Sequence, residues 1–143
     1  MREVVTELFE RYEREFNAAL AGEPDLEAIS RLYDDVFIAA TPAGVMTGQN
    51  DEELKKVMTA GFSHYRDIGT QRMEVRKIRV EPIDELHAIA RVDWRAVYIV
   101  GGGEKVIDFT NAYLARLKGD RATVFGWITG DEDAELRRHG VIE

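Results

Sequence analysis

The chain has 143 residues, of which 45% are hydrophobic and 32% are charged, and its net charge is −8 at pH 7. This composition is typical of one globular domain and excludes a disordered chain. The acidic balance disfavours nucleic acid and anionic membranes as partners, because like charges repel one another. Without cysteine, the chain can form neither disulfides nor thiolate metal sites.

The N-terminus shows no targeting signal, since residues 1–7 lack the uninterrupted apolar stretch of a signal peptide. No later window has the length and apolarity of a membrane span. We therefore expect a cytoplasmic protein whose residues 1–143 form a single domain.

The first half of the chain is mainly helical in pattern. Apolar residues recur every three or four positions over residues 3–20, which predicts an amphipathic helix. Pro24 can open a short second helix, because proline is tolerated at the first helical position. A third helix is predicted from Asn50, a favoured N-cap residue, with Glu53 at the capping-box position.

Strand patterns follow these helices. Residues 34–41 and 45–47 predict a small hairpin before the third helix, and the chain after Gln71 reads as a meander. The predicted long strands are 72–82, 86–100, 105–117 and 121–129. Helices followed by a meander indicate an α+β fold, with the N-terminal helices packed on a curved antiparallel sheet.

Alternation along residues 86–100 places Trp94 on the inner face of the sheet and Arg91, Asp93 and Arg95 on the outer face. A hairpin loop at Gly102-Gly103 would place Asn111 opposite Trp94. The same register would place Phe109 opposite Ala96 and Tyr113 opposite Val92. An amide on an apolar inner face needs a partner, so Asn111 indicates a cavity that holds water or a ligand.

The segments Asp25-Leu26-Glu27-Ala28-Ile29 and Leu32-Tyr33-Asp34-Asp35, the Gly48 before a capped third helix and the closing Trp127 carry a family resemblance. The chain resembles the nuclear transport factor 2-like superfamily, which includes the SnoaL-like polyketide cyclases and ketosteroid isomerase. The resemblance implies a cone-shaped, cystatin-like fold with a pocket, often dimerised through the sheet.

The resemblance gives only some of the catalytic residues of ketosteroid isomerase a counterpart in this chain. The position of its general base is held by Thr41, which cannot act as a carboxylate base. The oxyanion-hole tyrosine would fall near Glu15 or Phe16, with Tyr12 one turn away, and the oxyanion-hole acid falls at Asn111. The pocket tryptophan corresponds to Trp127. The candidate catalytic residues are Tyr12, His64 and Asn111.

Most aromatic side chains fall on faces that we expect to point inward, Phe125 among them. We predict that they line a ligand pocket together with Asn111 and a methionine of the third helix. The predicted ligand-binding residues are Phe16, Tyr33, Phe37, Met58, Phe62, Trp94, Tyr98, Phe109, Asn111, Tyr113 and Trp127. Trp127 joins Trp94 in this pocket only if the turn at Gly119-Asp120 gives the matching register.

Other chemical motifs favour structural roles. The histidines His64, His87 and His139 lack the spacing of metal ligands, so we expect no metal and no cofactor. The glycines at 101–103 lie between two strands and indicate a hairpin turn. Asp93 and Asp108 share the polar face with arginines, which favours cross-strand ion pairs over an acid/base pair.

The sequence predicts a protein that binds a small apolar molecule. Two alternatives stay open: an isomerase, cyclase or hydrolase acting on a small cyclic apolar substrate, and a non-catalytic dimerisation module with a filled core. We also expect a homodimer through the outer face of the sheet, where apolar side chains would otherwise meet water. The residues predicted for this face are Val97, Ile99, Val106, Ala112, Leu114, Val124 and Ile128.

Overall fold

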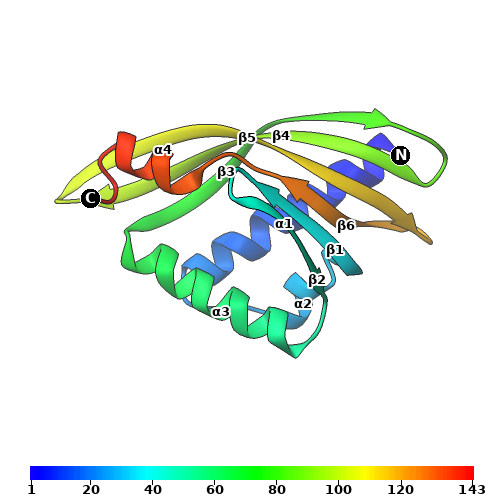
Figure 1. The fold of residues 1–143 in the computed structure, drawn as a ribbon, viewed down its shortest axis with the longest axis horizontal. Coiled ribbons are helices and arrows are strands. Elements are labelled where there is room, and N and C mark those ends of the chain that lie inside the picture. The colour runs from blue at the N-terminus through cyan, green and yellow to red at the C-terminus, as the bar shows by residue number, and fades with distance from the viewer.

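The computed structural model describes residues 1–143 and contains one six-stranded sheet with helices on its inner face (Figure 1). The helices are α1 (Arg2–Leu20), α2 (Leu26–Ser30), α3 (Glu52–Asp67) and α4 (Glu132–Arg138). The strands are β1 (Tyr33–Thr41), β2 (Gly44–Gln49), β3 (Thr70–Pro82), β4 (His87–Val100), β5 (Gly103–Lys118) and β6 (Arg121–Ile128). The three predicted helices are present, and α4 is an element that the sequence reading did not predict.

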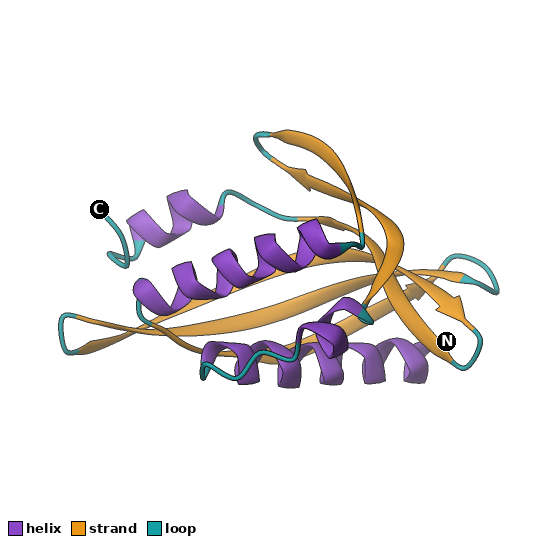
Figure 2. Ribbon diagram, turned by 90° about the horizontal axis from the view of Figure 1, so that it is seen from below, coloured by secondary structure: helices purple, strands orange, loops and turns teal.

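The sheet has the order β2-β1-β6-β5-β4-β3. Neighbouring strands are antiparallel except β1 and β6, which run parallel, so the sheet is mixed. Figure 2 shows the long strands β3, β4 and β5 crossing the molecule with α1 and α3 packed below and beside them. No helix is both long enough and apolar enough to cross a membrane.

The β4–β5 hairpin turns at Gly101 and Gly102, which both have positive φ angles of 59° and 79°. The predicted turn at Gly102-Gly103 was therefore wrong by one residue. Trp94 lies opposite Phe109, and Asn111 lies opposite Val92. Each partner is displaced by two residues from the predicted register, so the inner and outer faces keep the residues that alternation gave them.

A β-bulge in β6 sets the face of Trp127. The loop at Gly119 and Asp120 has two residues, which alone would turn Trp127 outward. The register shifts between Leu114 and Ala115, where Phe125 is the extra residue, and Trp127 then lies opposite Tyr113. Trp127 faces inward for this reason.

The inward placement predicted for Phe125 was wrong. The register of the two-residue turn already places Phe125 on the outer face, where it lies edge-on to His87 with ring centroids 6.0 Å apart. Simple alternation would put Phe125 and Trp127 on one face, and the bulge between them allows Trp127 alone to face inward.

Helix α1 is fixed to the edge strand β3 by polar contacts. The Asn17 side chain accepts a hydrogen bond from the Met73 N–H and donates one to the Met73 carbonyl, both at 2.8 Å. The Glu13 carboxylate accepts the N–H of Val75. Below these contacts, the buried face of α1 packs into the main core against the inner face of the sheet. The helix thereby satisfies edge-strand backbone groups that would otherwise be open.

The third helix begins one residue later than predicted. Asp51, not Asn50, is its N-cap and accepts the N–H of Leu54 at 3.2 Å. The Asn50 amide instead donates to the carbonyls of Ser30 and Tyr33. Both residues are good caps, and the tie to α2 and β1 decides between them.

The outer face of the sheet carries the predicted ion pairs. Arg95 lies opposite Asp108 and forms a bidentate contact with it at 2.8 and 3.0 Å. Asp93 accepts hydrogen bonds from Arg79 and Thr110. The acid/base pairing of the two aspartates is thus excluded, because each is held by its own partner on the outer face.

Two residues predicted for an exposed outer face are buried. Val124 belongs to the main inner core, since it precedes the bulge, and it is 0% exposed. Val97 is 1% exposed and is covered within the chain itself. Ile99, Val106 and Ile128 are exposed as predicted, and Ala112 and Leu114 are half-buried.

Replacing Gly69 by alanine should lower the melting temperature. Gly69 has a φ of 93°, and an added Cβ would lie 2.2 Å from the carbonyl oxygen of Ile99. That strand cannot move away freely, because the Ile99 N–H donates to the Gly69 carbonyl at 2.8 Å. We expect a loss of about 2 kcal/mol or more, or roughly 6 °C in thermal unfolding.

Gly61→Ala is the matched control, because no atom lies within 4 Å of the added Cβ on this α3 residue. It should raise the stability by about 0.5–1 kcal/mol, since alanine is the better helix former. Equal melting temperatures for the two variants would contradict the clash and the backbone strain expected for a side chain at position 69, just before β3.

Candidate functional site

A cavity of about 430 Å³ lies between α1, the inner face of the sheet, the end of α3 and the segment that leads into α4. Seven of the predicted ligand-binding residues line it: Phe16, Tyr33, Trp94, Phe109, Asn111, Tyr113 and Trp127. Trp94 and Trp127 therefore line the same cavity, although the bulge rather than the turn brings Trp127 there.

Aromatic rings form the deep wall of the cavity. Tyr12 stacks on Phe16 with centroids 4.4 Å apart and lies 5.7 Å from the Trp94 ring. On the other side, Tyr33 meets the edge of Trp127 at 5.5 Å. These rings come from α1, β1, β4 and β6, so the wall exists only when helix and sheet are assembled.

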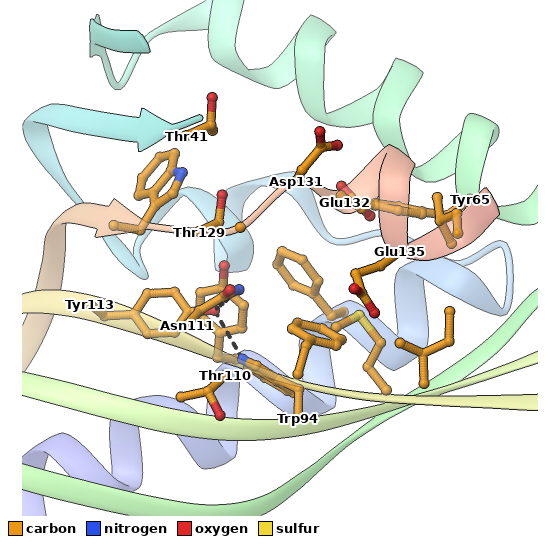
Figure 3. A pocket seen from close by; sticks show the side chains of 18 of the residues that line it. Thr41, Tyr65, Trp94, Thr110, Asn111, Tyr113, Thr129, Asp131, Glu132 and Glu135 are labelled. Atoms are coloured by element: carbon orange, nitrogen blue, oxygen red, sulfur yellow. Dashed lines mark hydrogen bonds between the residues drawn. The ribbon is translucent and has the colours of Figure 1, made fainter. Parts of the chain in front are cut away.

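A cluster of polar groups lies within this aromatic wall (Figure 3). The Trp94 indole N–H donates to the Tyr113 hydroxyl oxygen at 3.0 Å, and the Asn111 amide donates to the same oxygen at 3.3 Å. Nearby, the Tyr33 hydroxyl donates to the Tyr12 hydroxyl at 2.8 Å. The Trp94–Tyr113–Asn111 group and the Tyr33–Tyr12 group approach each other through the hydroxyl groups of Tyr12 and Tyr113.

The Tyr113 hydroxyl is hydrogen-bonded on every side. Burial raises its pKa, while hydrogen bonds with Asn111, Trp94 and Tyr12 act in the opposite direction. An indole and an amide nitrogen can only donate, so they saturate the phenol oxygen as an acceptor. The Tyr113 proton can in turn be donated to the Tyr12 hydroxyl. The deep end of the cavity is therefore a hydrogen-bonded cluster, in which the Tyr113 side chain is only 4% exposed.

Four predicted ligand-binding residues do not line the cavity: Phe37, Met58, Phe62 and Tyr98. Phe37 stacks on Trp127 at 5.1 Å, and Phe62 meets the edge of Phe16 at 5.1 Å. These two rings support the wall from behind. Met58 packs against the main core, and Tyr98 belongs to a smaller cluster under α4.

The catalytic candidates from sequence separate in space. Tyr12 and Asn111 line the cavity, but His64 is an exposed residue of α3 whose ring lies 6.0 Å from that of Tyr65. Thr41, at the position of the isomerase base, also lines the cavity. No group of three or more histidine, aspartate or glutamate side chains is arranged to hold a metal ion.

The segment that leads into α4 supplies cavity residues that sequence reasoning missed. Thr129 lies just after β6 beside Asn111, while Asp131 at the N-cap of α4 and Glu132 and Glu135 of α4 line the cavity together with Tyr65 of α3 (Figure 3). A signal was present, since Asp131-Glu132-Asp133 repeats the pattern of an N-cap followed by acidic residues that marks α3. Asp131 indeed caps α4 by accepting the Ala134 N–H at 3.0 Å.

The tyrosines should resist ionisation in the folded protein. Burial is the largest cause that raises the pKa of all five: Tyr12, Tyr33, Tyr65, Tyr98 (to about 12) and Tyr113. In the unfolded chain they should titrate at about pH 10. The folded state then binds more protons above that pH, so this contribution to stability is intact below about pH 10 and is lost as pH rises further.

A spectroscopic titration of tyrosinate absorbance tests this. The native protein should show almost no tyrosinate at about pH 10–10.5, where the chain in concentrated denaturant is half ionised. At higher pH, tyrosinate and loss of circular dichroism should appear together. A native titration that matches the denatured one would contradict the burial of these hydroxyls.

Solved structures with this fold support the architecture. An NTF2-like protein with a cystatin-like fold from Novosphingobium aromaticivorans matches with a TM-score of 0.70 and 17% identity, covering 99% of this chain and 88% of that chain. A protein with a cystatin-like fold from Caulobacter vibrioides matches with a TM-score of 0.67 and 14% identity, over 95% and 94% of the two chains. A ketosteroid isomerase-like protein from Erwinia carotovora atroseptica matches with a TM-score of 0.62 and 16% identity, over 90% and 93%.

These identities are low enough that the matches establish the cystatin-like fold and nothing of the activity. No protein of curated function matches the chain. The family model described as NTF2-like protein (DUF6841) matches residues 2–132, which confirms the resemblance to the nuclear transport factor 2-like superfamily. By its sequence and its fold, the chain belongs to this NTF2-like family, DUF6841.

Proposed function

We propose that the protein binds a small, largely apolar molecule in the cavity between α1 and the sheet. The observation that carries this proposal is the cavity of about 430 Å³, whose wall is aromatic and whose deep end holds the hydroxyl group of Tyr113 and the amide of Asn111. Pockets for small molecules combine such apolar walls with a few polar groups that fix orientation. A ring-shaped ligand with one acceptor oxygen fits both features.

The polar groups would orient the ligand. Asn111 is half-buried and makes one long hydrogen bond, at 3.3 Å, so its carbonyl oxygen is free toward the cavity. The Tyr113 hydroxyl lies beside it and can turn its proton toward a ligand oxygen, because a hydroxyl rotates to suit its partners.

The alternatives differ in support. A dimerisation module with a filled core is disfavoured, because such a core would leave no cavity of this size. An isomerase, cyclase or hydrolase acting on a small cyclic substrate has one specific observation in its favour: the Tyr113 hydroxyl and the Asp131 carboxylate line the same cavity. A turnover screen with cyclic ketones and epoxides would identify such an enzyme, and binding without turnover would exclude it for those substrates.

Asn111→Leu should separate binding from stability. The substitution removes one weak contact, so the melting temperature should change by less than about 3 °C. Binding of 2-naphthylmethanol, a neutral ring with one oxygen, should weaken roughly tenfold if a hydrogen bond is lost. Calorimetric titration and thermal unfolding measure the two effects.

Thr123→Val is the control, because this residue of the same sheet does not line the cavity and its hydroxyl donates to Asp34. It should leave the affinity unchanged. A large fall in melting temperature for Asn111→Leu, or no binding of the probe by the wild-type protein at millimolar concentration, would overturn the proposed binding role.

We also expect the chain to form a homodimer through the outer face of the sheet. Val36, Ile38, Val45 and Ile128 are 43–71% exposed on β1, β2 and β6. Ala40 pairs with both Val45 and Ile128, so these side chains form one continuous surface with Ile38. Burying this surface against a second copy would remove it from water.

Ile38→Lys should yield a monomer in light scattering at a concentration where the wild type is a dimer, with little change in fold. Val57→Lys is the control, since Val57 is 63% exposed on α3, away from this surface. A wild-type protein of monomer mass, or equal dissociation of both variants, would rule out this interface.

A further inference from the structure

A second cavity, of about 420 Å³, lies among α2, α3, the start of β1, the end of β5 and the start of β6. We call it the polar cavity, because nine of its ten lining residues are polar or charged. It shares only Tyr33 with the lining of the aromatic cavity. Its lining holds four cations and two carboxylates, namely Arg31, Lys55, Lys118 and Arg121 against Glu27 and Asp35. This local excess of cations contrasts with the net charge of −8 of the whole chain.

Strand pairing brings three of these cations to one end of the sheet. The Leu32 carbonyl accepts the Val124 N–H at 2.8 Å, so Arg31, just before Leu32, lies at the end of the sheet where β6 begins with Arg121. Lys118 is the residue opposite Arg121 across the β5–β6 turn. Backbone hydrogen bonds of the sheet therefore hold these positions together, and the charged side chains are not needed for it.

The two lysines are neutralised within the protein. Each of them lies between two carboxylates, which balance its charge. The ion pairs are Lys55 with Glu27 and Glu52, and Lys118 with Asp34 and Asp35. Both carboxylates of the cavity lining, Glu27 and Asp35, are thus bound to a lysine and repel an incoming anion less than free carboxylates would.

The two arginines have no such partner. Neither guanidinium group forms an ion pair or a side-chain hydrogen bond, whereas Arg95 on the outer face is bound by both oxygens of Asp108. Glu27 lies near Arg31, but Lys55 is the larger cause that lowers the pKa of Glu27. Two guanidinium groups therefore line one cavity with positive charges that the protein itself does not balance.

Such a pair of arginines suits an oxyanion. The planar fork of N–H donors in a guanidinium group matches two oxygens of a phosphate, and two forks match its two negative charges. A volume of about 420 Å³ lies in the range of small-molecule sites, so it holds more than the anionic group alone. The Asn50 amide nitrogen donates to the carbonyls of Ser30 and Tyr33, which leaves its oxygen to accept from a ligand hydroxyl.

We propose that the polar cavity binds a small organic phosphate, whose phosphate group lies between Arg31 and Arg121 and whose hydroxyl groups face Asn50. This is a second site, which goes beyond the binding of an apolar molecule in the aromatic cavity. The two sites are independent in their chemistry, because one is lined by rings and the other by charged and polar side chains.

Calorimetric titration with glucose 6-phosphate, inorganic phosphate and glucose tests the proposal. We expect glucose 6-phosphate to bind at millimolar concentration or below, inorganic phosphate to bind more weakly, and glucose not to bind. The affinity for glucose 6-phosphate should fall as salt is raised, because Arg31 and Arg121 are exposed to solvent.

The double substitution Arg31→Gln and Arg121→Gln should weaken the binding of glucose 6-phosphate roughly tenfold or more, because charge-assisted hydrogen bonds are lost. Arg2→Gln with Arg11→Gln is the matched control, since it removes the same charge from α1. Arg2 and Arg11 line neither cavity and form no ion pair, so this variant should keep the affinity.

Each contrary outcome has a definite meaning. No binding of glucose 6-phosphate by the wild type, or an equal loss of affinity in both double variants, would overturn the site. Retained affinity in the Arg31→Gln and Arg121→Gln variant would overturn it as well, and circular dichroism checks that both variants are folded. If inorganic phosphate binds as tightly as glucose 6-phosphate, the organic part of the ligand is overturned and the free ion is the ligand. None of these outcomes affects the function proposed for the aromatic cavity, which 2-naphthylmethanol tests separately.

Discussion

The extra residue in β6 decides which side chains form the cavity. Residues before Phe125 pair with β5 in the register of the two-residue turn, and those after it pair one position later. Without this shift Trp127 would project from the outer face, and so would Thr129 two residues later. The bulge therefore joins a tightly packed half of β6, with Ala122 and Val124 fully buried, to a half that lines a cavity.

The polar cluster that this register brings together has a physical requirement of its own. Tyr12, Tyr33 and Tyr113 are almost completely buried, and hydroxyl groups in such surroundings need partners. Trp94 and Asn111 provide donors, and the phenols serve one another. Each of these phenols can both donate and accept, so the cluster satisfies its own polar groups at the wall of the cavity.

Much of this arrangement followed from the sequence, because alternation along β4 and β5 is regular. The inner position of Trp94, Phe109 and Asn111 was correct even though the turn at Gly101 and Gly102 was misplaced. A displacement of two residues changes the partners across a hairpin but not the faces. Ion pairs on the outer face, such as Arg95 with Asp108, were predictable for the same reason, because alternation assigns both residues to that face.

What the sequence could not provide depended on interruptions of that regularity. Gly126 directly follows the bulge, and a glycine inside a strand can mark one, but this signal was not used and Phe125 was placed on the wrong face. Long-range contacts likewise decided the cap of α3, where Asn50 is held by Ser30 and Tyr33. Phe37 and Phe62 form a second layer of rings behind the cavity wall. Their positions depend on packing distances, which the hydrophobic periodicity of the sequence does not predict.

The two ends of the cavity have different structural origins. The deep end, with the hydroxyl groups of Tyr12 and Tyr113, is built from α1 and the central strands, which form the main core. The acidic end, with Glu132 and Glu135, is built from the short helix α4, which is held by a separate cluster. Leu136 of α4 packs there against Tyr98 and Ile107, and the family match ends at residue 132, where α4 begins. Charge at the α4 end can therefore change with little cost to the main core, while a change at Tyr113 would disturb the cluster that Trp94 and Asn111 complete. The acidic end of the cavity is in this way separated from the core that stabilises the fold.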